Sequence, residues 1–168
     1  MTFIGIISDC KSFEKIKENL KNQCDLDLNL IHINKNSIEN IKNIRFEVII
    51  IDSNLIEFSN TIEIVQELCS YAKYLVINTD INLKFDLANK INVITYGLNQ
   101  KSTITVSSIT ETDILIYLQR DIKNINNKII EIGEKRIKLQ EKSKLKTYEI
   151  LIIYIILLIY NKPIMDEL

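Results

Sequence analysis

The sequence contains few of the residues that build metal sites, disulfides or catalytic triads. It has no tryptophan, one proline, three glycines and one histidine among 168 residues. Its three cysteines are Cys10, Cys24 and Cys69. Because their number is odd and no C-x-x-C pair is present, we expect no disulfide framework, and without a second histidine we expect no zinc site. We therefore assign no metal site and no catalytic residue.

The single histidine, His32, alternates with Leu28 and Leu30 in a strand-like stretch. A Ser-His-Asp triad could be built only on His32, and no nucleophile motif surrounds any serine. We therefore interpret His32 as a structural histidine.

The charge balance argues against a general nucleic-acid-binding protein. The net charge is −1, so the strong positive field of such proteins is missing. A basic run over residues 134–146 lacks aromatic side chains that could stack on bases. We interpret this run as a solvated strand edge, where lysines also discourage pairing between sheets.

Long hydrophobic segments are also missing. The longest apolar run, residues 150–160, is shorter than the about 20 residues that a membrane-spanning helix needs, so it predicts a buried helix. The N-terminal stretch MTFIGIISD lacks the basic region and cleavage site of a signal peptide. With the unpaired cysteines, these features predict a cytoplasmic protein with no membrane span.

The composition, 46% hydrophobic and 26% charged, is typical of a soluble globular protein, and we expect a single α/β domain over residues 1–168. In residues 1–97, strand-like and helix-like patterns alternate. Strands are predicted over 2–8, 26–33, 46–52, 74–78 and 92–96, and helices over 11–22, 62–71 and 82–90. This alternation predicts a mainly parallel, Rossmann-like or P-loop-like sheet with flanking helices.

The pattern changes after Gly97, in residues 98–168. Strand-like segments follow without helix-length spacers, which predicts antiparallel strands. They cover residues 103–109, 114–120 and 128–139, with a turn at 124–127. An apolar C-terminal helix is predicted over 145–160, ended by Asn161 in a left-handed conformation and by Pro163.

The stretch GIISDCKS has the spacing of a phosphate-binding loop, with Cys10 in place of the second glycine. Gly5, Lys11 and Ser12 match that loop, but a side chain at Cys10 would occupy the space of the phosphate. We favour an ordinary strand-to-helix turn, with Asp9 or Ser12 capping the helix, over a degenerate or a working phosphate loop.

Asp52 follows a run of apolar residues, as a magnesium-associated aspartate does in nucleotide hydrolases. The stretch RFEVIIIDSNL also resembles the phosphoacceptor strand of response-regulator receiver domains. That resemblance implies that Asp52 accepts the phosphate and that Asp9 helps to hold Mg²⁺. It also implies that Thr79 is the switch hydroxyl after the fourth strand and Lys101 the lysine after the fifth. Receivers carry paired acidic residues after the first strand and end in a fifth helix, and this sequence has neither.

Residues 74–168 resemble the ATP-binding central domain of the Mur ligase family. Three blocks carry the resemblance: KYLVINTDINLK, NVITYGLNQKSTITVSSI and LKTYEILIIYIILLIYNKPIMDEL. Asn78 and Asp80 match the family's Asn-x-Asp-Asp signature, but its last aspartate is replaced by Ile81. The helix residues that contact the nucleotide in the family, one histidine and two asparagines, are here Leu145, Lys146 and Glu149.

The resemblance implies a Mur-ligase-like protein that has lost its chemistry. We expect a non-catalytic protein that acts through protein partners or as a homo-oligomer, with no required cofactor. The alternatives are a weak nucleotide or phosphate sensor, binding Mg²⁺-ATP, and a receiver-like phosphoacceptor using Asp52. The vestigial nucleotide-binding residues are expected to be Gly5, Lys11, Ser12, Asp52, Asn78 and Asp80.

Overall fold

The computed structural model describes residues 2–23, 28–82, 91–140, 144–164 and 166–168. The chain forms two compact units, Met1–Ile94 and Thr95–Leu168. Both units contain strands and helices, so the expected mixed α/β class is confirmed.

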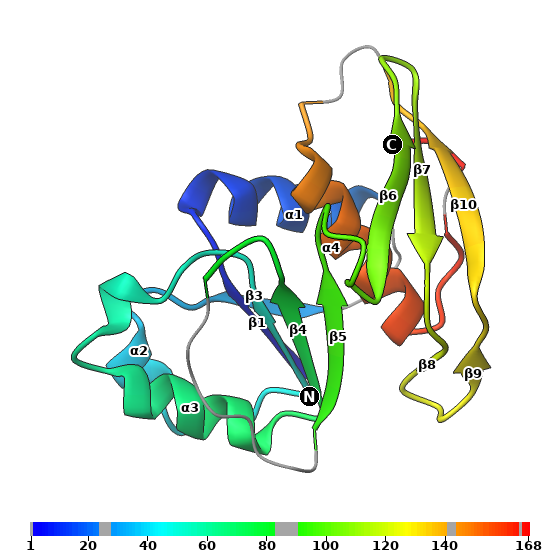
Figure 1. Ribbon diagram of the computed structural model, residues 1–168. Helices are drawn as coiled ribbons and strands as arrows, with labels where there is room; N and C mark the ends of the chain where they lie inside the picture. The colour runs from blue at the N-terminus through cyan, green and yellow to red at the C-terminus, as the bar shows by residue number, and fades with distance from the viewer. Residues whose placement is uncertain (1, 24–27, 83–90, 141–143, 165) are drawn as a thin grey trace. The chain divides into compact units, whose positions relative to one another are not determined.

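Four parallel strands form the centre of the first unit (Figure 1). They are β1 (Phe3–Ile7), β2 (Asn29–His32), β3 (Val48–Ile51) and β4 (Tyr74–Asn78). Their order is β2-β1-β3-β4, and β5 (Asn92–Tyr96), which begins in this unit, follows β4. The predicted parallel sheet is therefore confirmed, and every residue of β3 is buried, as a strand covered on both faces requires.

Helices flank these strands, with α1 on one side and α2 and α3 on the other in Figure 1. Their bounds are Cys10–Gln23 for α1, Ile38–Ile41 for α2 and Ile62–Tyr71 for α3, and a 3₁₀-helix, η1, covers Ile56–Phe58. The predicted apolar stripe of α1, Phe13, Ile16 and Leu20, is buried. The helix predicted over 82–90 lies outside the described residues, apart from Asn82.

Antiparallel strands dominate the second unit, as predicted. β6 (Ile104–Ile109), β7 (Asp113–Leu118) and β10 (Gly133–Lys138) pair in that order. A separate hairpin joins β8 (Ile122–Lys123) to β9 (Ile129–Ile130) around the predicted turn at 124–127. The single strand expected over 128–139 is wrong, because residues 131 and 132 separate β9 from β10.

The last helix, α4 (Thr147–Ile159), is shorter than the apolar helix predicted over 145–160. It begins later because Lys146 is extended and precedes the helix. It is not apolar throughout, because Glu149 is buried in its first turn. Asn161 adopts the predicted left-handed conformation, with φ 53°. Among the described residues, no helix is long and apolar enough to span a membrane.

Candidate functional site

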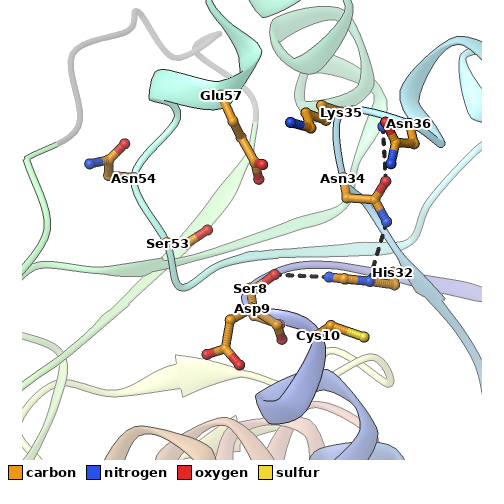
Figure 2. A pocket seen from close by; sticks show the side chains of 10 residues that line it. All are labelled: Ser8, Asp9, Cys10, His32, Asn34, Lys35, Asn36, Ser53, Asn54 and Glu57. Atoms are coloured by element: carbon orange, nitrogen blue, oxygen red, sulfur yellow. Dashed lines mark hydrogen bonds between the residues drawn. The ribbon is translucent and has the colours of Figure 1, made fainter.

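A pocket of about 840 Å³ lies in the first unit, at the carboxyl ends of β1, β2 and β3 (Figure 2). The second strand of the chain, β2, pairs with one side of β1, and the third, β3, pairs with the other side of β1. Open α/β sheets bind their ligands at such a switch point. The lining residues are Ser8, Asp9, Cys10, His32, Asn34, Lys35, Asn36, Ser53, Asn54 and Glu57.

The turn after β1 is organised by Asp9, which caps α1. Its Oδ1 accepts a hydrogen bond from the Ser12 amide at 3.0 Å, and its Oδ2 accepts one from the Ser12 hydroxyl at 2.8 Å. Ser12 is buried, so its hydroxyl serves the cap. The predicted cap is therefore confirmed for Asp9, and the geometry is that of a strand-to-helix turn.

Gly5 lies inside β1 and away from this turn. A Cβ atom there would lie 2.5 Å from Ile33 Cδ1 and 3.0 Å from Phe46 Cδ1. Because Gly5 has no side chain, the Ile33 and Phe46 side chains can pack close to its backbone. Lys11 is exposed and does not line the pocket. The structure therefore does not gather Gly5, Lys11 and Ser12 into a loop around one anion.

His32 forms part of the pocket wall, where both ring nitrogens have partners. Nε2 lies 2.8 Å from the Ser8 carbonyl oxygen and Nδ1 lies 3.3 Å from the Asn34 amide nitrogen. Because a carbonyl only accepts, Nε2–H is the donor to Ser8. The ring also stacks on Phe13, with centroids 4.8 Å apart and an interplanar angle of 18°. Both ring nitrogens and the ring face are therefore engaged, as expected of a structural histidine.

The loop after β2 is held by the Asn34 and Ser37 side chains. Asn34 Oδ1 accepts hydrogen bonds from the amides of Asn36 at 2.9 Å and Ser37 at 3.1 Å. Ser37 Oγ donates to the His32 carbonyl oxygen at 3.0 Å. These bonds fix the backbone of the tip, where Lys35 and Asn36 are exposed to solvent.

Three of the predicted nucleotide-site residues meet at the ends of β3 and β4. Asp52 Oδ1 accepts a hydrogen bond from the Asn78 side-chain amide at 3.1 Å. Asn78 Oδ1 accepts one from the Asp80 amide at 2.9 Å, and the Asn78 side chain is buried. Asn78 therefore joins the two strand ends as a hydrogen-bonded bridge.

Three of the four receiver-like residues, Asp9, Asp52 and Thr79, lie in the first unit. Asp52 directly follows β3, and Thr79 directly follows β4. Asp9 directly precedes α1. Lys101 belongs to the second unit. Within the described part of the chain, no group of three or more His, Cys, Asp or Glu residues could hold a metal ion.

Sequence reasoning missed the residues that complete the pocket. Lys35, Asn36 and Glu57 match no motif, and Ser53 and Asn54 lie in the stretch RFEVIIIDSNL but received no role there. Their position in the sequence could have identified them, because each follows a strand that the alternating pattern already predicted to be parallel. Loops after parallel strands are the usual ligand-binding segments of such sheets.

The residues at the positions of the Mur-ligase histidine and asparagines are Leu145, Lys146 and Glu149. The Lys146 amide donates a hydrogen bond to Glu149 Oε2 at 2.7 Å, which caps the first turn of α4. Glu149 thus stabilises the helix start. Comparison with models of known protein families and with curated proteins finds no match.

Proposed function

We propose that this chain is a non-catalytic binding protein that takes a small polar molecule into the pocket at the carboxyl ends of β1, β2 and β3. The observation that carries the proposal is the position of the pocket at the β1/β3 switch point of a parallel sheet. Its size is within the range of small-molecule sites, and hydrogen-bonding side chains from three loops line it.

The hydrogen bonds of His32 and Asp9 in the pocket wall support binding without turnover. His32 uses both ring nitrogens in structural hydrogen bonds, and Asp9 directs both carboxylate oxygens at Ser12. A general base needs a free lone pair within reach of the substrate proton. His32 offers none without breaking a contact, because Nε2–H donates to Ser8 and the Nδ1 lone pair faces the Asn34 amide.

A binding protein without catalysis needs a way to report occupancy, so we propose that protein partners read the bound state. From the resemblance over residues 74–168, we also propose descent from a Mur-ligase-like domain without ligase activity. Leu145 and Glu149 support the absence of ligase activity, because an aliphatic chain and a capping carboxylate cannot make the nucleotide hydrogen bonds of a histidine and an asparagine.

A ligand screen with a blocked pocket tests the main proposal. Nucleotides with Mg²⁺, sugar phosphates, neutral sugars and amino acids would be added separately, and the melting temperature and amide NMR shifts recorded. Ser53→Trp fills the pocket, and Ser59→Trp adds the same ring at an exposed turn position outside it.

We expect at least one probe class to stabilise the natural protein and Ser59→Trp but not Ser53→Trp. Shifts should centre on the three pocket loops. Binding that survives in Ser53→Trp, or no pocket shift with any probe, would contradict the proposal.

A receiver-like phosphoacceptor is the second candidate. The strand order β2-β1-β3-β4 and the positions of Asp52 after β3 and Thr79 after β4 favour it. Beryllofluoride with Mg²⁺ should then shift the amides of both residues, and Asp52→Asn should abolish the shifts. If beryllofluoride changes neither amide, this candidate fails.

A further inference from the structure

The pocket presents two opposite charges that neither contact one another nor any described partner. The Lys35 ammonium and the Glu57 carboxylate form no hydrogen bond and no ion pair with the described residues. Asp9, His32 and Asn34, by contrast, are engaged in structural hydrogen bonds. The two unpaired charges are therefore the groups most available to a ligand.

These charges come from different loops and face the same space. Lys35 follows β2, and Glu57 lies in η1 after β3. In Figure 2, the Lys35 side chain extends toward Glu57, whose carboxylate points into the pocket. Ser53 adds a hydroxyl to the lining of the same pocket, again without a hydrogen bond to a described residue.

We propose that the ligand of this pocket is a small zwitterion, with its anionic group at Lys35 and its cationic group at Glu57. The inference rests on the proposed binding function and names the ligand class. A ligand of either single charge would leave one of the two side chains facing a like charge or no charge. A triphosphate fits less well, because the carboxylates of Asp9 and Glu57 outnumber the single lysine.

Ser53 and Asn36 are suited to orient such a ligand. The Ser53 hydroxyl and the Asn36 side-chain amide can each donate and accept hydrogen bonds, and neither has a side-chain partner among the described residues. Uncharged contacts of this kind would add selectivity among zwitterions, while the charge pair sets the class.

Matched ligands test the class directly. Free L-alanine, L-serine and L-glutamine would be titrated against the labelled protein, together with their N-acetyl forms and their carboxamide forms. N-acetylation removes the cation and amidation removes the anion. We expect each derivative to bind roughly tenfold more weakly or worse than the free amino acid.

Charge-removing variants assign each end of the ligand. Lys35→Met should abolish the preference for the free amino acid over its carboxamide, and Glu57→Gln should abolish the preference over its N-acetyl form. Lys11→Met and Glu67→Gln are the controls, because both residues are exposed and lie outside the pocket lining. Both controls should keep both preferences.

The outcomes separate this inference from the function on which it rests. If neutral sugars or Mg²⁺-ATP perturb the pocket amides and zwitterions do not, the ligand class is wrong and the binding function stands. Equal binding of free and blocked amino acids also overturns the class. If no probe perturbs the pocket, the binding function itself is wrong.

Discussion

At the scale of single residues, the turn after β1 uses its phosphate-loop-like residues for packing and capping. Gly5 admits Ile33 and Phe46 to the core, and Ser12 is held by Asp9. The same residue types would hold a phosphate only in a loop with free amides and a free hydroxyl. The role of Gly5 is thus decided by Ile33 and Phe46, which are distant in sequence, and that of Ser12 by Asp9, three positions earlier.

Replacing Gly5 with alanine should destabilise the first unit. The new methyl group would lie 2.5 Å from Ile33 Cδ1 and 3.0 Å from Phe46 Cδ1, and both side chains are buried. Overpacking of this kind costs about 1–3 kcal/mol, which urea unfolding would measure.

The matched control for this substitution is Gly133→Ala. There the added Cβ would meet only the Glu131 carbonyl oxygen at 4.0 Å, an ordinary contact. Its unfolding free energy should change little. If Gly5→Ala is as stable as Gly133→Ala, the close packing at β1 is not as described.

Burial also sets the reactivity of Cys69. Desolvation raises the pKa of its thiol from an ordinary 9.0 to about 12, and the thiolate is the form that attacks alkylating reagents. Cys10 is an exposed free thiol. Iodoacetamide at pH 8 followed by peptide mass spectrometry should label Cys10 in the native protein and Cys69 only after unfolding. Equal labelling of both would contradict the buried position of Cys69.

At the scale of elements, two asparagines adopt a left-handed conformation, one in a turn between strands and one after a helix. Asn127, in the turn between β8 and β9, has φ 59°, and Asn161, after α4, has φ 53°. Asparagine tolerates this left-handed conformation better than most residues. Only Asn161 also bonds a buried side chain, because its Oδ1 accepts from the Asn124 amide at 3.1 Å.

Glycine substitution should separate these two roles. Asn127→Gly should leave the unfolding free energy unchanged or slightly higher, because glycine adopts positive φ without strain. Asn161→Gly should lower it by about 1–2 kcal/mol, because the buried Asn124 amide loses its acceptor. Chemical denaturation of both variants makes the comparison, and equal effects would mean that the Asn124 contact does not matter.

Elements with strong local patterns were predictable, and short ones were not. The bounds predicted for α3, β4 and β5 agree with the structure. The helix α2 was not predicted, because Ile38–Ile41 is too short to show a helical period. The break between β9 and β10 was also missed, since residues 131 and 132 continue the strand-like pattern.

At the scale of the whole molecule, burial holds several weak acids in their protonated form. The pKa of Cys69 is raised to about 12. The pKa of Tyr154 is raised by burial, and that of Tyr74 is raised by burial and by the nearby Glu47 charge. In each case the unfolded chain releases its proton at a lower pH than the folded protein does.

Stability should therefore fall at alkaline pH. Below about pH 9 these groups are protonated in both states, so the free energy of unfolding is at its full value. As the pH rises from 9.0 toward about 12, ionisation favours the unfolded chain. Urea unfolding across this range should show a smaller decrease in Cys69→Ala than in the natural protein, while Cys10→Ala should match the natural protein. A flat profile would contradict the prediction.

The sequence by itself determined the α/β class, the parallel first half and the antiparallel second half, because these depend on local periodicity and turn residues. Only the tertiary structure decided the site. The pocket combines three loops that are far apart in the chain, after β1, β2 and β3, and parallel pairing alone brings their ends together. Lys35 and Glu57 belong to no motif, and they share a pocket because the strand order places β2 and β3 on either side of β1.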